Sequence, residues 1–285
     1  MTLAFNYNPH IRTGKRPALA HKQTAPLSIV SHRSDSWLQI EADLPPTPSY
    51  TAMELLAHNR ALPAGVKVCS AEGKRRVLRT DLPLADPDDT PDAGSLAVAE
   101  DNLAAAARQL AGDFTPELSS SSACEANTAD ISHLCAEHGW TCVQRDADRW
   151  MIDLDVPSAI YMQAKAILEH GEVTLTAVIG SWQSASPASI EAIGNLLLNA
   201  GATLRMASPS IEMGDDGSIH ALLSVRILAA DASAYFHHAL CSLSIGARCL
   251  SREIRELQSP SIAGAYLAIV AADMPPASST KENER

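Results

Sequence analysis

Two short segments of this chain share one pattern, and an internal repeat constrains a fold more strongly than any single motif. The segments are residues 35–45 and 148–157. Each begins with Asp-x-Trp, continues with an apolar stretch and ends with Asp, an apolar residue and Pro. The spacing from Trp to Pro differs by one residue, which a β-bulge can absorb. We therefore expect Trp37 and Trp150 at matching positions on two strands that end at proline.

The elements that follow the two segments also match. A helical pattern runs over 53–62 and stops near Gly65, and a second runs over 190–198 and stops near Gly201, where glycine suits a left-handed helix cap. After each glycine the pattern predicts two strands joined by a turn and then a helix. These elements are Val66–Ser70, Arg76–Leu82 and Ser95–Leu110 in the first half, and Ala202–Ser208, Ser218–Leu228 and Ala232–Cys249 in the second. The sequence therefore predicts an α+β protein of two related domains, each an antiparallel sheet packed by helices.

The two halves are unequal in length. The second half adds a helix at Asp130–His138 and a hairpin of Tyr161–Glu169 with Val173–Gly180, where the first half has only 45–50. The first copy is therefore expected to be reduced. The domain organisation that follows is a disordered basic arm (1–24), a reduced α+β repeat (25–114), a linker (115–128), a C-terminal α+β domain (129–258), an apolar segment (259–274) and a disordered tail (275–285).

The order of elements in the second half is helix, three or four antiparallel strands, helix, two strands, helix. This order resembles the small chaperones of the type III secretion system and related chaperone-like proteins. The resemblance covers residues 130–257 fully and 27–110 in reduced form, so the chain looks like a tandem, fused copy of that fold. It implies a sheet backed by helices, an internal pseudo-dimer, and a role in holding a segment of a client protein along apolar patches and strand edges.

Charge and hydropathy exclude several classes of partner. The formal net charge is -11, and a negative protein repels phosphate backbones and anionic lipid, so we expect neither nucleic acid nor membrane as a partner. No run of about 18 apolar residues would span a bilayer, and the N-terminus lacks the apolar stretch of a signal peptide. A cytoplasmic location is therefore expected, with the six cysteines as reduced thiols.

Signatures of catalysis are missing from the sequence. It contains no Gly-x-Ser-x-Gly elbow, no His-Glu-x-x-His and no phosphate-binding glycine loop, so no catalytic or cofactor-binding residue is assigned and no cofactor is expected. Zinc remains open as an alternative, because cysteine and histidine gather between residues 124 and 142, but their order fits no common zinc module and no metal site is assigned. These residues are Cys124, His133, Cys135, His138 and Cys142.

Four aromatic residues are the candidates for contact with a partner: Trp37, Trp150, Tyr161 and Trp182. Tryptophan is enriched at binding hot spots, but each matched Trp can equally plug the core of its domain. The leading hypothesis is a non-enzymatic protein-binding module, chaperone-like, acting as a monomer with an internal pseudo-dimer or as a homodimer. The alternative is an enzyme or small-ligand-binding protein with a site between the two domains.

Overall fold

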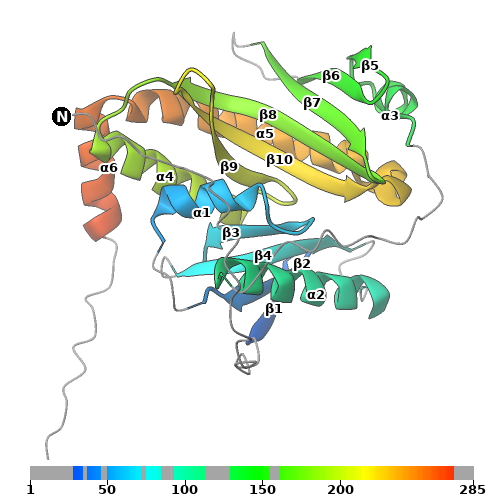
Figure 1. The fold of residues 1–285 in the computed structure, drawn as a ribbon, viewed down its shortest axis with the longest axis horizontal. Helices are drawn as coiled ribbons and strands as arrows, with labels where there is room; N and C mark the ends of the chain where they lie inside the picture. Colours follow the sequence, from blue (N-terminus) through cyan, green and yellow to red (C-terminus); the bar gives the residue numbers. More distant parts are fainter. Residues whose placement is uncertain are drawn as a thin grey trace, which may run out of the picture.

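A computed structural model describes residues 28–34, 37–45, 50–71, 75–84, 91, 93–112, 129–154 and 161–272. It contains two antiparallel sheets and six helices, so the predicted α+β class is confirmed (Figure 1). The arm at 1–24, the linker at 115–128 and the tail at 275–285 lie outside the described residues. Among the described helices, none combines the length and the apolarity needed to cross a membrane.

The first half forms a four-stranded sheet in the order β1-β2-β4-β3. The cap of its first helix is encoded locally: the Thr51 side chain accepts from the Glu54 backbone N–H, and the Glu54 carboxylate accepts from the Thr51 backbone N–H. The second helix packs on β2, β3 and β4. The elements are β1 (Ile29–Ser34), β2 (Trp37–Asp43), α1 (Ala52–Asn59), β3 (Val66–Ser70), β4 (Arg76–Pro83) and α2 (Ala93–Leu110).

The second half forms a six-stranded sheet in the order β5-β6-β7-β8-β10-β9. The long helix α5 packs along one face of this sheet, as Figure 1 shows for β8 and β10. The elements are α3 (Ile131–Glu137), β5 (Cys142–Asp146), β6 (Arg149–Leu154), β7 (Met162–Glu169), β8 (Glu172–Trp182), α4 (Pro187–Thr203), β9 (Ser208–Met213), β10 (Ile219–Leu228), the 3-10 turn η2 (Ala229–Asp231), α5 (Ala232–Leu257) and α6 (Pro260–Ala272).

One order of elements occurs in both halves. Each half contains two strands, a helix, two more strands and a helix, which are β1-β2-α1-β3-β4-α2 in the first half and β7-β8-α4-β9-β10-α5 in the second. The order of these strands within the sheets is also the same, β1-β2-β4-β3 and β7-β8-β10-β9. Among the described residues, the segment that only the second half has is therefore α3-β5-β6, and the expectation that the hairpin of β7 and β8 is the addition is wrong. That the two halves are related by duplication stays a prediction.

The predicted match between Trp37 and Trp150 is also wrong. Trp37 begins β2, which directly precedes α1 and pairs with β4. Trp150 lies on β6, which pairs with β5 and β7 and is two strands away from the next helix. The counterpart of β2 by pairing is β8, so the two similar segments occupy different places in their sheets.

The strand expected at 202–208 begins only at Ser208, because α4 continues through Gly201 to Thr203. Gly201 is therefore a helix residue and not a left-handed cap. A Cβ atom at Gly201 would lie 3.1 Å from the Cβ of Cys69 on β3, so the missing side chain lets α4 approach the other half closely. Gly65, by contrast, has the expected left-handed φ of +76°, but α1 already ends at Asn59 with Arg60 as its C-cap, so Gly65 is not the cap residue.

The two halves contact each other reciprocally. Helix α1 packs on β9 and α4, while α4 packs on β3, and β3 lies beside β9. The crossing of α1 and α4 is tight, because a Cβ atom at Gly194 would lie 2.9 Å from the Cβ of Ala52. The Asn59 amide links both halves by donating to the Val68 carbonyl (3.2 Å) and the Pro209 carbonyl (2.7 Å). Such exchange of equivalent elements is the contact pattern of a two-fold dimer, here within one chain.

Candidate functional site: the open face of the six-stranded sheet

The six-stranded sheet has one covered face and one face with exposed side chains. On β6, β7 and β8 the burial alternates residue by residue, as a half-buried strand requires. Ile152, Ala164 and Ala177 lie on the inner face in one cross-strand row, and all three are buried beneath the helices. The opposite face of β5–β8 is called the open face, and its residues are Val143, Met151, Asp153, Gln163, Lys165, Ile167, Thr174, Thr176 and Val178.

The open face is mixed in character, with apolar side chains at its centre. Register places Met151 directly between Val143 and Lys165, and Ile167 between Arg149 and Thr174. Val143 on β5 is 49% exposed and Val178 on β8 is 52% exposed, so exposed apolar side chains lie on both sides of this centre. An exposed apolar sheet surface bordered by charged side chains is typical of a surface that contacts another protein.

Tyr161 stands at one end of the open face, just before β7, and is 75% exposed. Its hydroxyl donates to the Asp153 carboxylate, and the Gln163 amide donates to the same Asp153 oxygen at 2.7 Å. These hydrogen bonds, that of Tyr161 first and that of Gln163 second, lower the pKa of Asp153. The three side chains thus hold the Tyr161 ring in place and leave a fixed carboxylate on the surface.

Strand β5 forms one edge of this sheet and pairs only with β6 among the described strands. Its residues from Val143 to Asp146 are exposed, and the pairing with β6 shifts register between Gln144 and Asp146. An edge strand presents unpaired backbone N–H and C=O groups, to which an extended peptide can add as a further strand. The open face therefore continues into a strand edge that is chemically ready for pairing.

The structure separates the four aromatic candidates. Trp150 is 6% exposed and its indole N–H donates to the Ser132 hydroxyl of α3 at 3.1 Å, and Trp182 is 5% exposed at the end of β8. Both are therefore core residues, which corrects their expected role as surface anchors, since a buried ring has no face left for a partner. Trp37 is half-buried on β2, in the other sheet. Only Tyr161 lies on the open face.

Sequence reasoning missed the valines of the open face. The one available signal was the alternation of apolar and polar residues along Met162–Ala166 of β7 and Glu172–Ala177 of β8, which matches the alternation of buried and less buried positions there. Alternation alone does not say that Val143 and Val178 would be exposed, because valine fits either face of a strand.

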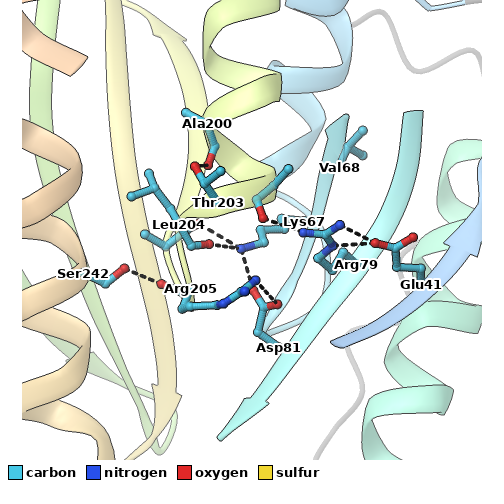
Figure 2. A network of polar contacts seen from close by, with 12 residues as sticks. Glu41, Lys67, Val68, Arg79, Asp81, Ala200, Thr203, Leu204, Arg205 and Ser242 are labelled. Atoms are coloured by element: carbon cyan, nitrogen blue, oxygen red, sulfur yellow. Dashed lines mark hydrogen bonds and ion pairs between the residues drawn. The ribbon is translucent and has the colours of Figure 1, made fainter. Parts of the chain in front are cut away.

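A second polar cluster, buried between the two halves, is shown in Figure 2. Lys67 of β3 lies with Nζ 2.7 Å from Oδ2 of Asp81 on β4, and these side chains are 2% and 1% exposed. Arg79 of β4 donates from Nε to the Glu41 carboxylate of β2 at 2.9 Å. Arg205, after α4, lies with NH1 3.8 Å from Oδ1 of Asp81. We call these five residues the buried ionic network.

The buried ionic network joins the sheet of the first half to the end of α4. Lys67 Nζ donates to the carbonyls of Leu204 and Ala207, and Arg79 NH1 donates to the Ala202 carbonyl at 2.6 Å. The last carbonyls of a helix lack partners within the helix and carry partial negative charge, so cations stabilise them. Lys67 and Arg79 therefore cap a helix of the other half, which makes the network a structural connection.

The cysteine and histidine residues considered for zinc do not converge. His133 is exposed and pairs with Glu137, with Nδ1 and Oε2 3.9 Å apart, while Cys135 is fully buried on α3. Within the described residues, no three Cys, His, Asp or Glu side chains are arranged to hold a metal ion. Cys124 lies outside the described residues.

The structure instead brings His138 onto α5. The rings of His138 and His237 stack with centroids 4.8 Å apart, and the Trp140 indole N–H donates to Nδ1 of His237 at 3.2 Å. His237 must be neutral with its proton on Nε2 to accept this bond, and Nε2 lies 3.6 Å from the Cys241 sulfur. Burial, and then the nearby His138 and His238, lower the pKa of His237.

The lowered pKa predicts that acid weakens the attachment of α3 to α5. Both folded and unfolded chains hold His237 neutral above pH ~6.5, the ordinary histidine value, so it contributes nothing there. As the pH falls below that value the unfolded chain binds the proton first, and the free energy of unfolding drops until the folded pKa is passed. Urea unfolding at pH 7.5 and 5.0 should therefore show a smaller pH-dependent loss in His237→Asn, whose amide still accepts from Trp140.

The expected difference is below about 1 kcal/mol, because solvent screens a half-exposed ring. An NMR titration of the histidine rings provides the direct check. A His237 that titrates at or above the ordinary value would contradict the prediction.

Comparison with known proteins places this chain in no family. No protein-family model matches the sequence. No curated protein matches it significantly either.

Proposed function

We propose that this protein is a non-enzymatic binding module that holds an extended segment of another protein on the open face. The observation that carries the proposal is the exposure of Val143 on the edge strand β5, where it lies beside Met151 of β6 on the open face. A segment paired to β5 would gain backbone hydrogen bonds, and its alternate side chains would lie beside Val143 on the open face. Tyr161 adds a large ring already oriented by Asp153.

The charges of the open face indicate which segment fits best. Lys165 and Arg149 are both exposed and stand beside Met151 and Ile167 in the cross-strand rows. In a chain with net charge -11, basic side chains next to an apolar centre favour a partner segment in which apolar and acidic residues alternate. A client segment of this kind is in keeping with the chaperone-like resemblance, which remains a proposal.

The internal pseudo-dimer forms part of the same proposal. In a two-fold dimer each copy would present one such sheet face, whereas in the part of this chain that the structure describes only the second half has the additional strands β5 and β6. The reciprocal contacts of α1 and α4 support a single chain that replaces a dimer of identical subunits. We therefore expect the isolated protein to be a monomer that binds one segment.

Selection of peptides from a random displayed library, followed by fluorescence titration, tests the proposed function. Val143→Glu should weaken binding of the selected peptides by at least about tenfold, which corresponds to ~1.4 kcal/mol, because it places a negative charge on the edge strand to which the segment pairs and repels acidic residues. Val98→Glu is the matched control, since Val98 is 57% exposed on α2, in the other half. Both variants should keep the wild-type unfolding midpoint.

Two results would contradict the proposal. One is a set of selected peptides whose affinity is the same for wild type and Val143→Glu. The other is an equal loss of peptide affinity in the Val98→Glu control, which would show that a negative charge on any exposed surface is enough to weaken binding.

A further inference from the structure

Two cysteine thiols meet where α3 joins the edge strand β5. Cys135 is fully buried on α3, and Cys142 is the half-buried first residue of β5. The chain turns back between them, because the Trp140 backbone N–H donates to the Cys135 carbonyl at 2.8 Å. Cys142 pairs in register with Ile152, which is buried on the inner face, so the Cys142 side chain points to the side on which α3 packs. Cys142 packs against the hydrophobic core cluster to which Cys135 belongs.

The other described cysteines have no such neighbour in reach. Cys69 is buried on β3, in the sheet of the first half. Cys241 and Cys249 lie eight residues apart on α5, about 12 Å along the helix axis, which is too far for a disulfide. Cys249 is exposed and therefore reports whether an oxidant can react with the protein at all.

We propose that Cys135 and Cys142 form a reversible disulfide that ties the edge strand β5 to α3. The oxidant is a low-molecular-weight disulfide of the glutathione class. The half-exposed Cys142 thiol loses its proton and attacks one sulfur of the oxidant, which forms a mixed disulfide and releases one glutathione thiolate. Cys135 then loses its proton and attacks the Cys142 sulfur, and the second glutathione leaves. Two protein thiols are oxidised and one oxidised glutathione is reduced to two thiols.

The order in which the two thiols react follows from their accessibility to solvent. Cys142 is the thiol that solvent reaches, whereas Cys135 has no exposed surface. Burial, followed by the interaction of its thiol with the neighbouring Cys142 thiol, raises the pKa of Cys135, so Cys135 reacts slowly with anything except the sulfur beside it. The oxidised protein would hold the first residue of β5 against α3, two residues before the register of β5 and β6 begins to shift. This modification site is independent of the proposed binding function.

Peptide mapping of the full-length protein in glutathione redox buffers tests the proposal. The reduced protein is equilibrated over a range of oxidised to reduced glutathione, blocked with an alkylating agent and cleaved with trypsin and a Glu-specific protease. Cleavage after Glu125, Glu137 and Arg145 separates residues 126–137, with Cys135, from 138–145, with Cys142. We expect these two peptides as one disulfide-linked species, lighter by two hydrogen atoms than the reduced pair, whose fraction rises with the oxidant.

Variants distinguish the two steps. Cys135→Ser should accumulate glutathione on Cys142, because the resolving thiol is gone. Cys142→Ser should leave Cys135 reduced, and Cys249→Ser should form the linked species to the same extent as wild type. The proposal is overturned if Cys249 becomes glutathionylated while the linked species is absent, or if wild-type Cys142 accumulates glutathione as Cys135→Ser does.

Discussion

Lys67→Met should destabilise the protein by about 3 kcal/mol or more, the cost of leaving one member of a buried ion pair without its partner. The Asp81 carboxylate would remain 1% exposed, with Arg205 as its remaining cation at 3.8 Å. The carbonyls of Leu204 and Ala207 would also lose the ammonium group that caps them. Urea unfolding followed by circular dichroism measures the loss as a shift of the midpoint.

The double variant Lys67→Met with Asp81→Leu shows how much of the lost stability comes from the unpaired Asp81 charge and how much from changed packing. Replacing a whole buried ion pair by apolar side chains of similar volume is often neutral or stabilising, so the double variant should recover most of the loss. Arg252→Ala is the matched control, because its ion pair with Glu256 is at the surface and should change the free energy of unfolding by less than about 1 kcal/mol. A single Lys67→Met variant as stable as wild type would show that the network does not hold the halves together.

Trp150→Ala should lower the free energy of unfolding by about 3–5 kcal/mol, the usual cost of removing a buried tryptophan. The ring is 6% exposed, and its N–H donates to Ser132, so β6 and α3 lose contact together. Trp150→Phe keeps most of the apolar volume and loses only the hydrogen bond, so it should cost less than about half as much. Differential scanning calorimetry of the three proteins measures the effect.

Trp37→Ala serves as the comparison for Trp150→Ala. Trp37 is half-buried on β2, so its removal leaves a smaller cavity and should cost clearly less. Equal losses in the two variants would support the equivalent core positions that the sequence pattern predicts and would contradict the assignment of these residues to non-equivalent strands. If Trp150→Ala were as stable as wild type, Trp150 would again be a candidate for contact with a partner at the surface.

Local patterns were sufficient for most of the secondary structure. The strand Val66–Ser70 was predicted to the residue, and α1, β4, α2, β10 and the start of α5 followed from hydrophobic period and turn residues. These signals are physical properties of short segments, such as the alternation of β7 or the glycine at positive φ before β3. They need no partner from elsewhere in the chain, so the sequence contains them directly.

Those local patterns did not predict which strands pair with each other. The similarity of residues 35–45 and 148–157 is real in sequence, yet β2 and β6 have different neighbours, because strand order depends on long-range contacts. The sequence likewise does not indicate that the charged residues Lys67, Arg79 and Asp81 are buried. Only the approach of α4 removes water from them and supplies backbone carbonyl groups to Lys67 and Arg79. Burial is a property of the assembled halves.

For the candidate site, too, the sequence identified some residues and the tertiary structure decided between them. Tyr161 could be nominated from the sequence as an aromatic residue beside a hairpin, but Trp150 and Trp182 look the same by that criterion. Residue type and period establish which positions share a face of a strand. Which face is covered depends on where α5 and the other half pack, and that choice is made by the total apolar area buried in the folded chain.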